Sequence, residues 1–135
     1  MKLTKIQKKE ISKMAKKYGL KLILLFGSFA NGKHRQDSDF DIAIMGKGKI
    51  DFKNQIKLIN SFSQVFKRNI DLSIINCANP LLLFQISKNA KLIYGNEKDF
   101  FKFKLYAFHR YNDYAPYFKI EENLNKKFIR KYAAR

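Results

Sequence analysis

Residues 27–44 read GSFANGKHRQDSDFDIAI, and this stretch decides the fold. The apolar run 21–26 (KLILLF) ends at its first glycine, and a second apolar run, 40–45 (FDIAIM), begins near its end. Short apolar runs bounded by glycine and polar residues predict buried strands. We therefore expect two strands joined directly by residues 28–38, which form a turn or a short helix plus a loop.

Acidic side chains stand at the start of two of the predicted strands. Asp39 and Asp41 are two residues apart, so in an extended chain both carboxylates point to the same face. Two like charges held together are costly unless a cation neutralises them, and Mg²⁺ prefers oxygen ligands of this kind. Asp71 opens a third predicted strand, residues 70–75 (IDLSII), and we expect it to reach the same edge of the sheet.

The pair Gly27-Ser28 ends the first strand, where free backbone N–H groups and a hydroxyl suit phosphate oxygens. Glycine lets a phosphate approach the backbone closely. Together with Asp39, Asp41 and Asp71, this turn has the layout of a two-metal phosphoryl-transfer site.

The acids have two other interpretations. A calcium loop starting at Asp37 would need glycine at its sixth position and glutamate at its twelfth, where Ile42 and Gly48 stand. An isolated Asp-x-Asp more often caps a turn or faces solvent. The combination with Gly27-Ser28 and Asp71 favours a functional site.

The remaining elements follow from helix signals. Thr4 and Gln7 form a capping-box pattern that opens a first helix, and Gly19 is suited to end it. Asp51 is placed to cap a second helix, and Asn79-Pro80 to open a third. The segment 91–94 predicts a short edge strand. The predicted order is α-β-β-α-β-α-β-α, an α/β fold with a small mixed sheet flanked by helices.

The chain after residue 97 has a helical pattern with many aromatic and basic residues. We expect a helix from Glu97 to about residue 115, an end or a kink at Pro116, and a last helix over about 119–132. Three apolar side chains at helical spacing are expected to pack on the sheet: Phe101, Leu105 and Phe108. Five tyrosines could anchor a protein interface, stack on bases or belong to the core: Tyr106, Tyr111, Tyr114, Tyr117 and Tyr132.

Composition sets broad limits. With 135 residues, 46% of them apolar, we expect one domain over residues 1–135, with a core at about 20–95 and a C-terminal helical extension at about 97–135. The single cysteine, Cys77, cannot form an internal disulfide, which fits a reducing cytoplasm. No stretch resembles a signal peptide or a membrane span. The net charge of +17 would attract nucleic acid or another polyanion, or it reflects an AT-rich genome.

The stretch 27–44 resembles the signature of the minimal nucleotidyltransferases of the DNA polymerase beta superfamily: a Gly-Ser pair, ten residues, then Asp-x-Asp. Gly32 and Ser38 also match that pattern, Asp71 matches the family's third acid, and FQISKNAKLIYG at 84–95 resembles its ending. The chain departs from many members at Phe29 and Asn31, where those members carry arginine. Lys33, His34 and Arg35 could supply the missing charge, or they belong to a solvated loop.

This resemblance implies a polymerase beta-like fold with C-terminal helices and ATP as the donor of AMP. Gly27 and Ser28 would hold the triphosphate, and Asp39 and Asp41 would bind two Mg²⁺ ions, with Mn²⁺ as an alternative metal. Asp71 would help to bind the catalytic metal and assist deprotonation of the attacking hydroxyl.

The chain is also similar in length to the antitoxin halves of HEPN–nucleotidyltransferase toxin–antitoxin pairs, which belong to this superfamily, and its stretch 103–122 (FKLYAFHRYNDYAPYFKIEE) resembles the ending of that subgroup. That resemblance implies transfer of AMP to a tyrosine of a HEPN-type RNase toxin. Two alternatives stay open: an enzyme acting on a small molecule or an RNA end, and a module that neutralises a toxin by binding without catalysis.

Overall fold

The computed structural model describes residues 3–28, 30, 32 and 39–133. A four-stranded sheet has the order β3-β2-β1-β4. Strands β1 (Leu20–Phe26), β2 (Phe40–Gly46), β3 (Ile70–Ile74) and β4 (Lys91–Tyr94) have nearly the predicted bounds. The sheet is mixed, because β1 is antiparallel to both β2 and β4 while β2 and β3 are parallel. The predicted α/β class, the direct step from the first strand to the second, and the edge position of residues 91–94 are therefore confirmed.

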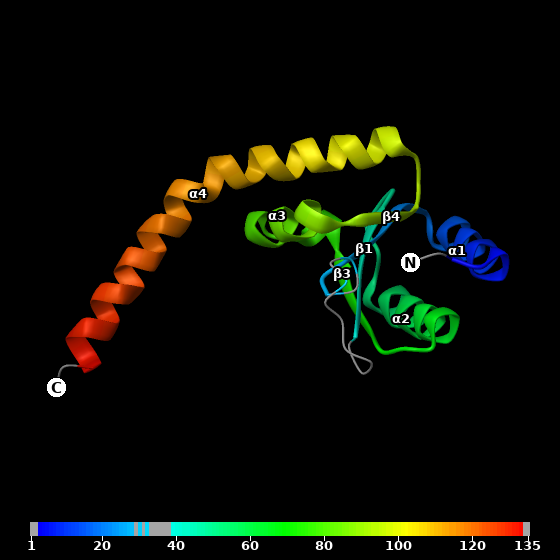
Figure 1. The fold of residues 1–135 in the computed structure, drawn as a ribbon, viewed down its shortest axis with the longest axis horizontal. Coiled ribbons are helices and arrows are strands. Elements are labelled where there is room, and N and C mark those ends of the chain that lie inside the picture. The colour runs from blue at the N-terminus through cyan, green and yellow to red at the C-terminus, as the bar shows by residue number, and fades with distance from the viewer. Residues whose placement is uncertain (1–2, 29, 31, 33–38, 134–135) are drawn as a thin grey trace.

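Helices cover both faces of this sheet (Figure 1). One face packs on α1 (Lys5–Tyr18) and α2 (Phe52–Phe66), and the other on α3 (Pro80–Asn89) and the first part of α4 (Glu97–Ala133). Alternation along the strands divides the core accordingly. In β2, Ile42 and Ile44 face α1 and α2, whereas Ala43 and Met45 face α3 and α4. A 3₁₀ turn, η1 (Ile75–Cys77), connects β3 to α3.

Local capping fixes where the first three helices begin. The Thr4 hydroxyl accepts from the Gln7 backbone N–H, and the Gln7 side chain accepts from the Thr4 N–H. Asp51 and Asn79 accept from backbone N–H groups three residues on, at 2.7 and 2.9 Å. Such caps satisfy N–H groups that have no partner inside the helix. These three predicted starts are confirmed.

The C-terminal part differs from the sequence expectation. Residues 97–133 form one helix of 37 residues that continues through Pro116, so a separate last helix is wrong. Figure 1 shows a bend midway along α4, which fits a proline that removes one backbone hydrogen bond and crowds the preceding turn. Beyond the bend the helix projects away from the sheet (Figure 1).

The face of α4 that packs was also predicted wrongly. Phe101, Leu105 and Phe108 are 62%, 44% and 52% exposed, whereas Phe103 and Ala107 are buried. Both groups of residues have helical spacing, so the spacing alone does not decide which of them is buried. The contact with α3 buries Phe103 and Ala107. The rings of Phe84 on α3 and Tyr111 on α4 stack there with centroids 3.9 Å apart. Tyr111 thus belongs to a helix–helix contact, whereas three of the other tyrosines are exposed: Tyr106, Tyr114 and Tyr117.

Several sequence expectations lie outside the described residues. They concern Phe29, Asn31, Lys33, His34, Arg35, Ser38 and the side chain of Tyr132. Within the described part of the chain, no helix combines the length and the apolar character needed to cross a membrane.

Candidate active site

The candidate site is formed at the edge of the sheet where β1 ends and β2 and β3 begin, which is an end of the strands and not an edge strand. Asp41 is paired with Phe26 across the antiparallel ladder and with Asp71 across the parallel ladder. Ala43 faces α3 and α4, so Asp41, two residues earlier, points to the same side of the sheet. Ile70 and Leu72 face the opposite side, which directs Asp71 toward the α3 side as well.

The two carboxyl groups interact directly. Burial, the charge of Asp71, a side-chain hydrogen bond with Asp71 and the charge of Asp39, in that order, raise the pKa of Asp41 from 3.8 to about 6. A hydrogen bond between two carboxyl groups requires that one of them keeps its proton. Asp39 is exposed and lies immediately before β2, so it adds negative charge from the solvent side.

Gly27 lies against this pair. Its φ of 73° is in the left-handed region, which glycine adopts without strain. A Cβ built on Gly27 would collide with the Asp41 carboxyl group, so no other residue fits here without displacing that side chain. The Gly27-Ser28 turn is therefore in contact with Asp41, whereas the sequence predicted only that the turn and the acids belong to one site. Ser28 is half-buried in the same turn.

The donor set suits a divalent cation in its chemistry. All the candidate ligands are carboxylate oxygens, which Mg²⁺ and Mn²⁺ prefer, and their mutual repulsion is what a cation would relieve. The described residues nevertheless contain no group of three or more His, Cys, Asp or Glu already arranged around a metal position. Asp41 is half-buried and interacts with Asp71, whereas both Asp39 and Asp71 are exposed to solvent.

The polymerase beta nucleotidyltransferase family matches residues 9–99, which include all four strands and all the residues of this site. The chain belongs to this family. The match ends at the third residue of α4, so nearly all of that helix lies beyond the family domain.

The chain is similar in sequence to known proteins. It is 29% identical over 80 residues to the protein adenylyltransferase MntA of Shewanella oneidensis. The aligned region covers 59% of this chain and 58% of that protein. The chain thus matches less than two thirds of the length of that relative. Nucleotidyltransferases of this kind typically use ATP and a divalent metal ion.

Two solved structures share the fold. A chain of a toxin–antitoxin crystal structure with AMP-PNP superposes with a TM-score of 0.75 at 24% identity, covering 87% of this chain and 97% of that one. A structure of the tri-AMPylated Shewanella oneidensis HEPN toxin in complex with its MNT antitoxin gives a TM-score of 0.70 at 22% identity, covering 88% of this chain and 96% of that one.

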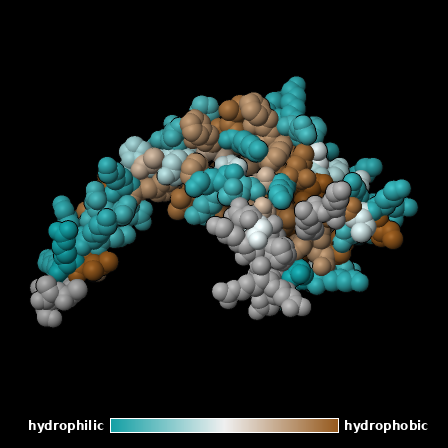
Figure 2. Space-filling model, viewed as in Figure 1, coloured by the Kyte–Doolittle hydropathy of each residue, from teal (hydrophilic) through white to brown (hydrophobic). Residues whose placement is uncertain are grey.

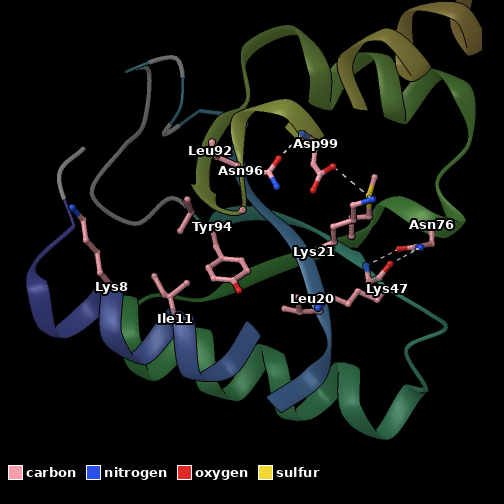
Figure 3. A pocket seen from close by; sticks show the side chains of 14 residues that line it. Lys8, Ile11, Leu20, Lys21, Lys47, Asn76, Leu92, Tyr94, Asn96 and Asp99 are labelled. Carbon is pink, nitrogen blue, oxygen red and sulfur yellow. Dashed lines mark hydrogen bonds and ion pairs between the residues drawn. The ribbon is translucent and has the colours of Figure 1, made fainter. Parts of the chain in front are cut away.

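A cavity of about 1040 Å³ lies at the opposite edge of the sheet, where β1 begins and β2 ends (Figure 3). Its polar lining groups are largely engaged with one another. The Asn76 amide bonds both the N–H and the C=O of Gly46, at 2.9 and 3.1 Å, and Lys21 pairs with Asp99 at 3.8 Å. Because the acids and the Gly-Ser turn lie at the other edge, this cavity is separate from the candidate active site.

Proposed function

We propose that this protein transfers AMP from ATP to a hydroxyl group of a protein partner, and specifically to a tyrosine of a HEPN-type RNase toxin. The observation that carries the proposal is the contact of Gly27 with Asp41, which in turn interacts with Asp71. This contact supports the proposal because backbone N–H groups that would bind phosphate then lie next to carboxylates that would hold the cation bound to that phosphate.

Each residue has a role that follows from its position. The backbone N–H groups at Gly27 and Ser28 would bind triphosphate oxygens, and the absent Cβ of Gly27 lets a phosphate approach. Asp39, Asp41 and Asp71 would hold two Mg²⁺ ions, which neutralise the phosphates and orient the attack when bound. Asp71 would accept the proton of the attacking hydroxyl, because it lies beside Asp41 at the open start of β3.

The reaction balances without a further reagent. The acceptor oxygen forms a bond with the α-phosphorus of ATP, and the bond from that phosphorus to the oxygen bridging to the β-phosphate breaks. Pyrophosphate leaves, and the hydroxyl proton passes to the carboxylate. In the related proteins, MntA is a protein adenylyltransferase and an AMPylated HEPN toxin is found in complex with an MNT antitoxin, which supports a protein as the acceptor here.

The test uses purified protein, Mg²⁺ and α-³²P-ATP in an extract of the native host, with Asp41→Asn as the control. We expect label on one discrete protein with the wild-type chain and none with Asp41→Asn. Phosphoamino-acid analysis of that protein should give AMP-tyrosine. Label on RNA or on a small molecule would instead support the alternative acceptors, and no label on any acceptor would contradict the proposal.

A further inference from the structure

The distal part of α4, residues 116–133, is called the arm here. It projects from the body of the protein beyond the bend in the helix (Figure 1). Residues 119–131 of the arm are all exposed. A helix of this length has marginal stability in water when nothing packs on it, because helices in proteins are stabilised mainly by burial of an apolar face.

The arm carries such a face. Tyr117, Ile120 and Leu124 are 66%, 57% and 60% exposed, and their spacing of three and four residues places them on one side of the helix. Phe128, which is 63% exposed, follows one turn further on. These four residues are called the stripe. Figure 2 shows apolar side chains on the arm among mostly hydrophilic ones.

The arm is placed to present a partner to the candidate active site. The first part of α4 packs on the face of the sheet toward which Asp41 and Asp71 point. In Figure 1 the start of β2 is at the lower end of the sheet, and the distal half of α4 descends in the same direction. A partner that spans from the arm to the body of the protein would approach the molecule from the side on which the acids lie.

The chemistry of the stripe indicates a protein. The centre of the stripe, Ile120 and Leu124, is aliphatic, and only its two ends, Tyr117 and Phe128, carry rings on which a base could stack. Regular spacing at three and four residues matches the packing of a helix in the facing molecule.

The charge of the arm indicates which kind of protein would bind it. The arm has five basic side chains (Lys119, Lys126, Lys127, Arg130 and Lys131) against two acidic ones (Glu121 and Glu122). A second copy of the chain would bring another net charge of +17 against it, which opposes self-association. An acidic surface flanking an apolar helix face is complementary to the arm.

We propose that the stripe on the arm docks an acidic protein that presents an apolar helix face. On the proposed function above, that protein is the one that accepts AMP, and the arm holds it while its hydroxyl group enters the site. Docking and catalysis then use separate parts of the chain, so they can be tested apart.

The first experiment is site-specific photo-crosslinking in an extract of the native host. Full-length protein with Asp41→Asn carries p-benzoylphenylalanine in place of Leu124 or, as a control, in place of Glu122. The control position is two residues away and therefore on the opposite side of the helix. We expect one protein of acidic isoelectric point, identified by mass spectrometry, to be crosslinked from position 124 and not from position 122.

The second experiment titrates the identified protein, once purified, against the full-length chain. Ile120→Gln/Leu124→Gln should weaken binding at least tenfold, because two apolar contacts at the centre of the interface are lost. Asn123→Gln/Asn125→Gln, which changes the flanking positions without changing charge, should alter it less than twofold. Circular dichroism confirms that both variants keep their helix content.

The outcomes separate docking from the proposed function. Crosslinking to a second copy of the chain, to nucleic acid or to a basic protein would overturn the docking proposal, as would equal or absent crosslinking from both positions. If the acidic protein binds through the stripe and no protein in the extract takes up AMP, docking stands and the adenylyltransferase function fails. If a protein takes up AMP and its binding is equal for both double variants, the function stands and the docking proposal is wrong.

Discussion

Asp41 and Asp71 lie directly opposite each other on the parallel strands β2 and β3, and their carboxyl groups share a hydrogen bond. Such a pair keeps a proton at a pH where isolated carboxyl groups have lost it, because two adjacent negative charges repel each other. A cation that binds these carboxylates would have to displace that proton. Metal binding and protonation should therefore compete at this edge of the sheet.

The first prediction concerns stability in the absence of metal. The pKa of Asp41 is 3.8 when unperturbed and about 6 in the fold, so between these pH values the folded protein binds more protons than the unfolded chain. The free energy of unfolding should then fall as the pH rises from about 4 to about 6. Because Asp41 is only half-buried, we expect a decrease in Tm of a few degrees in calorimetry with EDTA. Asp41→Asn should remove this component, and an unchanged pH profile in that variant would contradict the assignment.

The second prediction concerns metal affinity. A cation must displace the proton from Asp41, so Mg²⁺ or Mn²⁺ should bind more weakly in acid. For one carboxyl group with a pKa of about 6, the apparent affinity should be about tenfold lower at pH 5 than at pH 7. Titration of Mn²⁺ by electron paramagnetic resonance measures this ratio without any turnover. Equal affinities at the two pH values would show that Asp41 is not a ligand.

The third prediction concerns the Gly-Ser turn. Gly27→Ala should displace the Asp41 side chain and place a Cβ at a φ of 73°, where the left-handed backbone costs about 1–2 kcal/mol. We expect a lower Tm and a loss of AMP transfer of at least about 100-fold, as for other misplaced catalytic groups. Gly48→Ala is the matched control, because a Cβ there meets no atom within 4 Å. The two variants should differ clearly in labelling assays with α-³²P-ATP.

The fourth prediction distinguishes the two apolar faces of α4. Phe103 is 2% exposed and packs in the core with α3, so Phe103→Ala should cost about 3–5 kcal/mol in the free energy of unfolding. Phe101, two residues away, is 62% exposed, and Phe101→Ala should change stability by no more than about 0.5 kcal/mol. Urea denaturation of both variants provides the comparison. Equal losses would mean that the predicted face, and not the observed one, is packed.

Much of the fold could be predicted because its signals are local. The capping box of Thr4 and Gln7 and the Asn79-Pro80 start depend on residues within one helical turn. Asp71 was expected at the same edge of the sheet as Asp41 because both acids stand at the start of predicted strands, and the parallel pairing of β2 with β3 confirms that position. Their roles as metal ligands stay predictions.

The features that could not be predicted depend on distant contacts. Phe101 and Phe103 both belong to apolar series with helical spacing, and only packing on α3 decides which one is buried. Pro116 predicts a helix end in isolation, yet the helix on both sides tolerates the loss of one hydrogen bond. Position 27 requires glycine because a Cβ there would overlap with the Asp41 carboxyl group. This contact depends on the register in which β1 and β2 are paired, and the spacing of residues along the chain does not give that register.

Because α4 is one continuous helix, the arm is a projection of defined length. No linker separates the arm from the packed part of the helix, so the arm cannot change its orientation independently, as a segment on a flexible linker would. At 1.5 Å per residue, residues 116–133 extend about 27 Å from the bend, and a change of about 10° in the angle at Pro116 would move the tip by about 5 Å. The angle of the helix near Pro116 therefore sets where the arm lies relative to the candidate site, and a change in that angle would move a protein docked on the arm, as proposed above, while every residue of the site stayed the same.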